Sequence, residues 1–349
     1  MSVYQLNPLE DHRWHEFVDQ HPNSSIFHTP GWLEALRRSY GYEPIAYTTT
    51  PPGRDLTNGL VFCRVRSWLS GLRMVSLPFS DHCQPLIDHP KNAAELFAWL
   101  KDSRRRQQWK YIELRPAFAG NSLFESDGTF LQTESYLLHT LDLRPDLDSL
   151  FHRFDKSCIQ RKIRRAEREQ LVYEEGCSES LLAKFYSLLV LTRRRHGVPP
   201  QPLAWFRNLT ASCNDNILIR VASKGDQPVA AILTILHKGT LIYKYGCSDA
   251  QFNNLGGTPF LFWKAIQDAK NKGVTQYDLG RSEIENFGLI SFKENWGAKG
   301  IPLNYLRLAG AQAVHPHSDW VTRLAKNIFS RMPDTLLTAT GKLLYRHIG

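Results

Sequence analysis

The chain has 349 residues, 42% of them hydrophobic, and a formal net charge of +9, so it is long enough for two packed domains. No apolar run reaches the ~18 residues of a membrane-spanning helix, and the N-terminal residues lack the basic and apolar regions of a signal peptide, so we expect a cytoplasmic protein that is not integral to a membrane. Six cysteines lie far apart without a CxxC pair, so neither a metal site nor a disulfide framework is predicted.

The first predicted elements are a short helix and a pair of strands. Thr29 suits the N-cap of the helix, Pro30 suits its first turn, and Gly41 marks its end. Two strands follow at residues 43–50 and 57–66, joined by a turn that contains Pro and Gly. The pattern predicts a helix that precedes a β-hairpin.

The same order occurs again in the second half of the chain. A longer helix begins at Ser178 and ends near Gly197, and strands at residues 217–223 and 228–237 flank a short polar turn. This weak duplication predicts two similar α/β units, with the boundary after a strand at residues 136–143. The expected organisation is a first domain at residues 1–145, a second at 146–310 and a helical tail at 311–349.

A basic segment follows the expected boundary. Between Arg153 and Arg168 there are seven Lys or Arg residues against two acidic ones. Such a charge suits phosphates of RNA, of a nucleotide sugar or of a pyrophosphate lipid, and binding should then weaken with salt. A solvated helix face remains an equal alternative for this basic helix, residues 153–169.

The most informative stretch runs from Leu241 to Trp296. Leu241–Gly246 has strand composition, and a two-residue period would place Tyr243 and Tyr245 on one face. A Gly-Gly-Thr-Pro turn then opens a helix that should reach about Lys272, with Thr258 as the N-cap.

A second strand, residues 275–280, is expected to end in a loop that carries Arg281 and then Phe292 and Lys293. The order predicts an anion-holding acyl-transfer site, because a fixed ammonium stabilises the oxyanion that forms when an amine attacks an ester or thioester. A βαβ-like unit of an ordinary α/β domain is the alternative.

Several stretches resemble, in their order along the chain, the FemABX family of aminoacyl-tRNA-dependent peptidyltransferases and the related proteins with a BioF2-like acetyltransferase domain, all of the GNAT superfamily. The stretches are HTPGWLEALRRSYG, KSCIQRKIRRAERE, RRHGVPPQPLAWF, IYKYGCS, YDLGRSE and SFKENWG. The resemblance covers residues 27–308. It implies a mixed α/β fold of two tandem GNAT-like domains, each with a mostly antiparallel sheet flanked by helices, and a strand near residues 302–308 that returns to the first domain.

The resemblance also implies roles for particular residues. Lys293 and Phe292 match the acyl-transfer motif of the family and are the predicted catalytic residues. Gln201 departs from the family, since some members have an arginine there, which weakens the case for the usual nucleotide-linked peptidoglycan precursor. No residue is singled out as a general base. The predicted substrate-binding residues are Tyr243, Tyr245, Arg281, Arg37, Arg38, Arg161, Lys162, Arg164, Arg165, Gly256, Gly257 and Thr258.

The predicted function is transfer of an aminoacyl group from aminoacyl-tRNA, or of an acyl group, to an amine of an anionic cell-envelope or exopolysaccharide precursor. No permanently bound cofactor is expected. The alternatives are an N-acyltransferase that uses acyl-coenzyme A, and a non-catalytic GNAT scaffold that binds RNA or lipid. Residues 317–349 contain an apolar stripe with basic neighbours, so peripheral contact with an anionic membrane is a further hypothesis, beside simple packing on the second domain.

Overall fold

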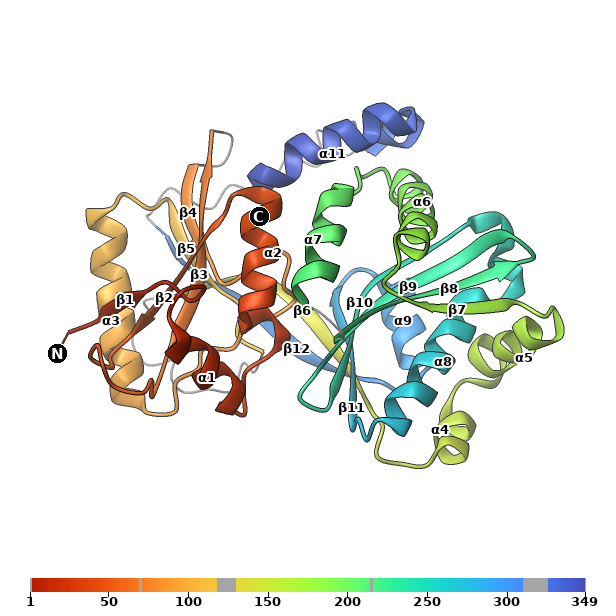
Figure 1. The fold of residues 1–349 in the computed structure, drawn as a ribbon, viewed down its shortest axis with the longest axis horizontal. Helices are drawn as coiled ribbons and strands as arrows, with labels where there is room; N and C mark the ends of the chain where they lie inside the picture. The colour runs from red at the N-terminus through yellow and green to blue at the C-terminus, as the bar shows by residue number, and fades with distance from the viewer. Residues whose placement is uncertain (1, 69–70, 118–129, 214–215, 310–325, 349) are drawn as a thin grey trace. The chain divides into compact units, whose positions relative to one another are not determined.

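The computed structural model describes residues 2–68, 71–117, 130–213, 216–309 and 326–348. The chain forms two compact units (Figure 1). The first consists of Met1–Tyr136, Pro302–Pro316 and Leu343–Gly349, and the second of Leu137–Ile301 and His317–Lys342.

The sheet of the first unit has the strand order β1-β2-β3-β4-β5-β12-β6. β4 and β5 are parallel, while β1–β2, β2–β3, β3–β4 and β5–β12 are antiparallel pairs. The elements are β1 (Tyr4–Leu6), α1 (His12–Gln20), η1 (Ile26–His28), α2 (Pro30–Tyr40), β2 (Glu43–Thr48), β3 (Leu60–Ser67), β4 (Gly71–Val75), α3 (Pro90–Arg106), β5 (Tyr111–Leu114) and the parts of β6 (Leu131–Asp142) and β12 (Lys299–Ala309) that lie in this unit.

Local capping explains where α2 begins and ends. The Thr29 side chain accepts a hydrogen bond from the Trp32 backbone N–H, and Gly41 takes the left-handed conformation at the C-cap with φ of 71°. The helix and the β2–β3 hairpin confirm the elements predicted here. The pairing of β12 with β5 confirms the returning strand that the family resemblance implied.

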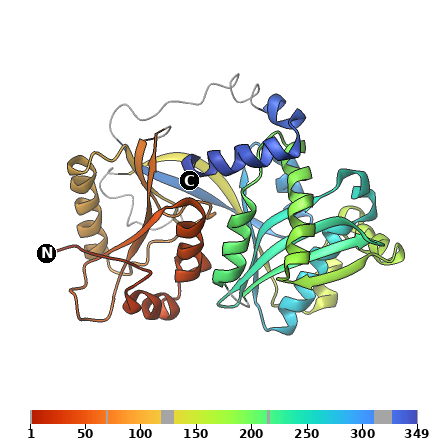
Figure 2. The ribbon, with the colours of Figure 1, turned by 45° about the horizontal axis from the view of Figure 1, so that its top comes forward.

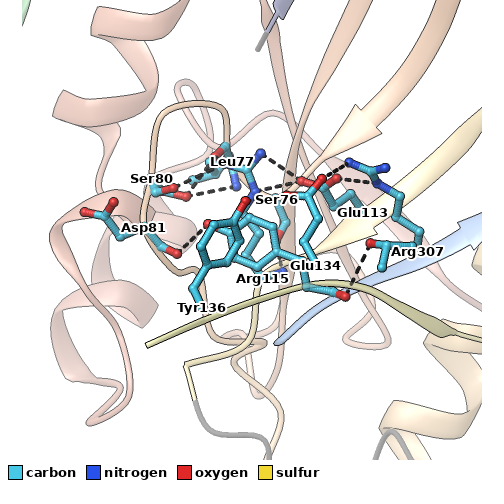
Figure 3. A network of polar contacts seen from close by, with 11 residues as sticks. Ser76, Leu77, Ser80, Asp81, Glu113, Arg115, Glu134, Tyr136 and Arg307 are labelled. Atoms are coloured by element: carbon cyan, nitrogen blue, oxygen red, sulfur yellow. Dashed lines mark hydrogen bonds and ion pairs between the residues drawn. The ribbon is translucent and has the colours of Figure 1, made fainter. Parts of the chain in front are cut away.

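A buried carboxylate ties three strands of the first unit together (Figure 3). Glu113, at 2% exposure, accepts hydrogen bonds from Arg115 at 2.8 Å and from Arg307 of β12 at 2.6 Å. Arg307 also pairs with Glu134 of β6 at 3.0 Å, and Tyr136 donates to Glu134. Burial alone would raise the pKa of Glu113, but the charges of Arg115 and Arg307 outweigh it and the pKa is lowered.

Arg115 also fixes the loop that follows β4. Its guanidinium donates to the Leu77 carbonyl at 2.7 Å and to the Ser80 carbonyl at 3.2 Å, and it lies over the Tyr305 ring (Figure 3). Tyr305 in turn donates to the Asp81 carbonyl at 2.7 Å. Hydrogen bonds to backbone carbonyl groups therefore hold the loop Ser80-Asp81-His82 in place.

The sheet of the second unit has the order β12-β6-β11-β10-β9-β8-β7. β10 and β11 are parallel, and β7–β8, β8–β9 and β9–β10 are antiparallel. The elements are α4 (Leu147–Arg153), η2 (Lys156–Gln160), α5 (Arg161–Arg168), β7 (Val172–Gly176), α6 (Glu179–Arg195), α7 (Leu203–Cys213), β8 (Ile217–Lys224), β9 (Gln227–His237), β10 (Thr240–Ser248), η4 (Ala250–Leu255), α8 (Gly257–Asn271), β11 (Gln276–Glu283) and α9 (Phe287–Glu294).

Helices cover both faces of strands β8–β10, with α8 on one face and α6 on the other (Figures 1 and 2). Gly257 of α8 lies against Ala230 of β9, where an added Cβ would stand 3.0 Å from the alanine methyl. On the opposite face, the Cys247 thiol lies 3.5 Å from the Phe185 carbonyl of α6. Ser178 caps α6 as predicted, by accepting from the Leu181 N–H.

Two predicted boundaries in the second unit are wrong. Residues 281–283 are not in a loop, because β11 continues to Glu283. Phe292 and Lys293 are not in a loop either, because the Asn286 side chain accepts a hydrogen bond from the Leu289 N–H and begins the helix α9.

The described part of the C-terminal tail includes the helix α11 (Asp334–Ile348). Leu337 is fully buried, and Gly341 lies so close to the Pro200 carbonyl of the second unit that a Cβ would stand 2.0 Å from that oxygen. Residues 317–325, which hold most of the predicted apolar stripe, lie outside the described residues. Within the described ranges, no helix is both long and apolar enough to span a bilayer.

Candidate functional site

The two parallel strands β10 and β11 pair over only three residues each. Thr240–Ile242 lies beside Gln276–Asp278, and β10 then carries a bulge at Lys244, between Tyr243 and Tyr245. Tyr243 is opposite Thr234 of β9, whereas Tyr245 is opposite the adjacent residue, Leu233. Neighbouring residues of a strand face opposite ways. The prediction that both tyrosines share a face is therefore wrong.

Tyr245 belongs to the face covered by α6 and α7. Its hydroxyl accepts hydrogen bonds from the Gln201 amide and the Trp205 indole, each at 2.9 Å. Both donors are buried, with Gln201 at 4% exposure and Trp205 at 0%. The residue that departs from the family pattern, Gln201, thus holds Tyr245 in place.

Replacement of Tyr245 by Phe should destabilise the second unit by about 1–3 kcal/mol, because it leaves two buried donors without their acceptor. Tyr243→Phe is the matched control, since Tyr243 is only partly buried and packs mainly through its ring. Urea denaturation followed by circular dichroism measures both. Equal midpoints for Tyr245→Phe and wild type would show that the two hydrogen bonds contribute nothing.

Tyr243 faces α8 and belongs to an aromatic cluster. Its ring centroid lies 4.7 Å from that of Phe262, and Phe262 in turn lies 5.5 Å from Phe292 and 5.3 Å from Trp296. Burial raises the pKa of Tyr243, so its hydroxyl stays protonated near neutral pH. The cluster connects the predicted residues Tyr243 and Phe292 through the side chain of one α8 residue.

The start of α8 is set by two glycines. Gly256 is the N-cap, in the left-handed conformation with φ of 79°, and an added Cβ would stand 2.2 Å from the Lys162 carbonyl oxygen. The predicted N-cap, Thr258, lies inside the helix instead. Close approach of α5 to this turn therefore requires glycine at position 256.

A cavity of about 230 Å³ opens at this turn. Its lining includes Lys162, Ser248, Asn253, Gly257, Thr258 and Phe292. The first N–H groups of a helix have no partner within it and carry partial positive charge, so the start of α8, with the cationic residue Lys162 in the cavity lining, favours an anion such as a phosphate. Four residues predicted from the sequence meet here: Lys162, Gly257, Thr258 and Phe292.

Gly256→Ala should lower the free energy of unfolding by about 1–3 kcal/mol more than Gly273→Ala. Both glycines have positive φ, 79° and 70°, but nothing lies within 4 Å of a Cβ built at Gly273. The control therefore carries the backbone strain without the collision with α5. Thermal unfolding of the two variants measures the difference, and equal losses would mean that α5 simply moves aside.

Lys293 is buried at 2% exposure on α9. Its ammonium donates to the carbonyl oxygens of Gly280 at 2.7 Å and Arg281 at 3.0 Å, both in β11. These bonds anchor the lysine to β11. The residue before it, Phe292, lines the cavity. The Arg281 side chain is half-buried, and the contribution of Arg281 to the site is its backbone carbonyl, which accepts from Lys293.

His139 of β6 is a neighbour of Lys293 that was not predicted from the sequence. It is fully buried, its Nδ1 lies 3.4 Å from the Ser282 hydroxyl, and its Nε2 has no hydrogen-bond partner within the described residues. Burial, and then the charge of Lys293, lower the pKa of His139, so the ring is neutral near pH 7. A lone histidine in a strand gives no sequence signal of this position.

The remaining predicted arginines do not line the cavity. Arg37 and Arg38 lie on α2 of the first unit, each 54% exposed and paired with Glu34. On α5, Arg161 is exposed, Arg164 lies over the Phe151 ring and Arg165 pairs with Glu169 at 2.9 Å. Among the described residues, no group of His, Cys, Asp and Glu is arranged to hold a metal ion.

Residues 155–289 match the family model described as an acetyltransferase (GNAT) domain. This part of the chain, which contains the bulged strand, the glycine turn and the cavity lining apart from Phe292, therefore belongs to the GNAT superfamily. No curated protein matches the chain in sequence.

The described part of the chain has the fold of tandem GNAT proteins such as FemX. It is similar to the crystal structure of FemX, with a TM-score of 0.67 at 12% identity over 93% of this chain and 100% of that one. L-PGS from Bacillus licheniformis gives 0.54 at 14% identity over 93% and 98%. A tandem GNAT protein from the clavulanic acid biosynthesis pathway, in a structure without AcCoA, gives 0.57 at 10% identity over 89% and 99%.

Proposed function

We propose that the protein transfers an aminoacyl or acyl group from a phosphate-bearing donor to an amine. The observation that carries the proposal is the cavity at the start of α8. There an anion-binding helix terminus and Lys162 lie beside Phe292, and the next residue is the buried Lys293. The donor phosphate would lie at the helix terminus, and its carbonyl would lie toward α9.

The reaction is an acyl substitution. The amine attacks the carbonyl carbon, a C–N bond forms, the C–O bond of an ester or the C–S bond of a thioester breaks, and the amine releases a proton. Lys293 would stabilise the oxyanion of the intermediate, because its ammonium is fixed in a dry environment by two carbonyl groups. His139 lies near this lysine but does not line the cavity, so no general base is assigned and the proton passes to solvent.

Aminoacyl-tRNA is the donor that the family resemblance favours. The exposed basic residues of α5, which packs on the turn before α8, would contact the RNA phosphates. Acyl-coenzyme A is the second candidate, because a pyrophosphate also suits a helix terminus beside a lysine. The structure of the clavulanic acid pathway protein is a form without AcCoA. This connects AcCoA with a protein of similar fold and supports the second candidate.

An anionic cell-envelope or exopolysaccharide precursor is our proposed acceptor. Contact of residues 317–349 with the inner face of an anionic membrane would suit a lipid-linked form, since Leu336 and Leu343 of α11 are 57% and 59% exposed. Liposome pelleting of the chain with and without these residues tests it. Equal partitioning of the two forms would eliminate the membrane contact.

A donor assay tests the proposed function. The purified protein is incubated with a pool of charged tRNAs or with a panel of acyl-coenzyme A thioesters, together with an acceptor fraction from cell extract. We expect loss of aminoacyl-tRNA, and a drop of about tenfold or more in rate with Lys162→Glu at subsaturating donor, because a charged hydrogen bond contributes ~1.5–3 kcal/mol. Lys101→Glu is the control, as Lys101 is exposed on α3 of the first unit.

Each other outcome of the donor assay has a definite meaning. Consumption of a thioester alone would assign the protein to the acyl-coenzyme A N-acyltransferases. Consumption of neither donor, with RNA binding that weakens in salt and survives Lys293→Ala, would favour the non-catalytic scaffold and contradict the proposal.

A further inference from the structure

A larger cavity, of about 530 Å³, lies elsewhere in the second unit. It is enclosed by the end of β6, by α4, by the start of β11 and by the loop after α9. It shares no lining residue with the cavity at the start of α8. Its volume is within the ~300–1,000 Å³ of small-molecule sites. Nothing in the proposed transfer reaction uses it.

The floor of this cavity is apolar with one polar group. Leu141, Leu150, Phe154 and Trp296 line it, and all are at most 4% exposed. The Trp296 indole N–H is buried and has no hydrogen-bond partner in the part of the chain that the structure describes. The indole N–H is covered by protein atoms, so the surface that this floor offers to a ligand is apolar.

The rim is polar and positive. Arg144 pairs with Asp142 at 2.8 Å, so these two charges offset one another. Arg153 and Lys299 are exposed on the same rim, and neither forms an ion pair within the described ranges. The rim therefore has an excess of two positive charges, which favours an anion.

The rim also has neutral hydrogen-bonding groups. The lining also includes Thr140, Thr275 and Gln276, whose side chains carry hydroxyl and amide groups. A hydrocarbon chain would leave these groups unpaired as it displaced their water. A heterocyclic base has an apolar body with donors and acceptors at its edge, and a phosphate attached through ribose would reach the cations.

We propose that this cavity is a second binding site, for a phosphorylated nucleoside. The ligand is either a free mononucleotide or an unpaired nucleotide of an RNA, since both present the same base and phosphate. The base lies against the apolar part of the lining, and the phosphate lies near Arg153 and Lys299. The site is distinct from the donor cavity and does not depend on which donor is used.

Calorimetric titration with AMP, adenosine and inorganic phosphate tests the site. AMP should bind at least about tenfold more tightly than adenosine or phosphate, because only AMP reaches both the floor and the cations. Arg153→Glu/Lys299→Glu should weaken AMP at least about tenfold. The charge-matched control is Lys101→Glu/Arg105→Glu, on exposed residues of α3, which should bind AMP as the wild type does.

Photocrosslinking with 8-azido-AMP locates the ligand without any substitution. Label in peptides within residues 140–154 or 275–299 supports the site, whereas label confined to residues 248–262 would place AMP in the donor cavity and overturn it. Absence of AMP binding at millimolar concentration, or equal weakening in the control variant, would also overturn it. A single-stranded RNA that competes at far lower concentration than AMP would identify RNA as the source.

Discussion

Lys293→Met should reduce turnover by about 10²–10³. The methionine keeps the length of the side chain but removes the ammonium, which donates at 2.7 Å and 3.0 Å to the Gly280 and Arg281 carbonyls and which we assign to the oxyanion. Steady-state kinetics with whichever donor the donor assay identifies measures the change. The loss should fall mainly on kcat, because the oxyanion exists only in the reaction and not in the bound donor.

The same substitution also tests the structural role of the lysine. Loss of the ammonium removes a donor from the buried Gly280 carbonyl, so the free energy of unfolding should fall by about 1–3 kcal/mol. Lys101→Met on α3 is the control and should change neither quantity. Turnover within twofold of wild type in a folded Lys293→Met protein would remove Lys293 from the catalytic assignment and leave it as the anchor of α9.

Glu113→Ala should destabilise the first unit by about 3–5 kcal/mol, the largest stability effect predicted for this chain. It removes the carboxylate between Arg115 and Arg307, which are only 12% and 25% exposed and would then have only the partly exposed Glu134 as a nearby counter-charge. Urea denaturation, with hydrogen exchange to locate the loss in the first unit, measures it. Glu134→Ala is the control, because Glu134 is 40% exposed and such a pair contributes only about 0–1 kcal/mol.

Acid should have a matching effect. The pKa of Glu113 is lowered in the folded protein, so its stabilisation is present above the unfolded value of ~4.3 and is lost as the pH falls through the folded value. Glu113→Gln should therefore show a shallower loss of stability below about pH 4. Identical acid-unfolding curves for wild type and Glu113→Gln would contradict the paired carboxylate.

Elements with local signals could be predicted from the sequence. The caps at Thr29 and Ser178 use side chains that bond within three residues, and the structure has both. The start of α9 has such a signal too, in Asn286, although the apolar run that follows does not show a clear helical period. A local capping rule is enough to find this helix.

Other features depend on contacts that no local rule describes. The bulge at Lys244 changes which face Tyr245 occupies, and the period of two assumes a regular strand. The N-cap is Gly256 and not Thr258. The Lys162 carbonyl lies against Gly256, a contact that leaves no room for a side chain there. His139 meets Ser282 only through the placement of β6 beside β11. Of the candidate site, the residue types at the glycine turn and on α9, and the basic residue Lys162, were predictable, but His139 and the partners of Tyr245 were not.

The position of β12 has a consequence for synthesis on the ribosome. β12 lies between β5 and β6 in the first unit, and Arg307 reaches Glu113, which is 194 residues earlier in the chain. The nascent first unit therefore lacks one of its internal strands, and one of the two arginine partners of Glu113, until nearly the whole second unit has emerged. Pairing at such sequence separation is slow. The first unit should therefore complete its folding after translation. The second unit, which is made of residues nearer to one another in sequence, should form first.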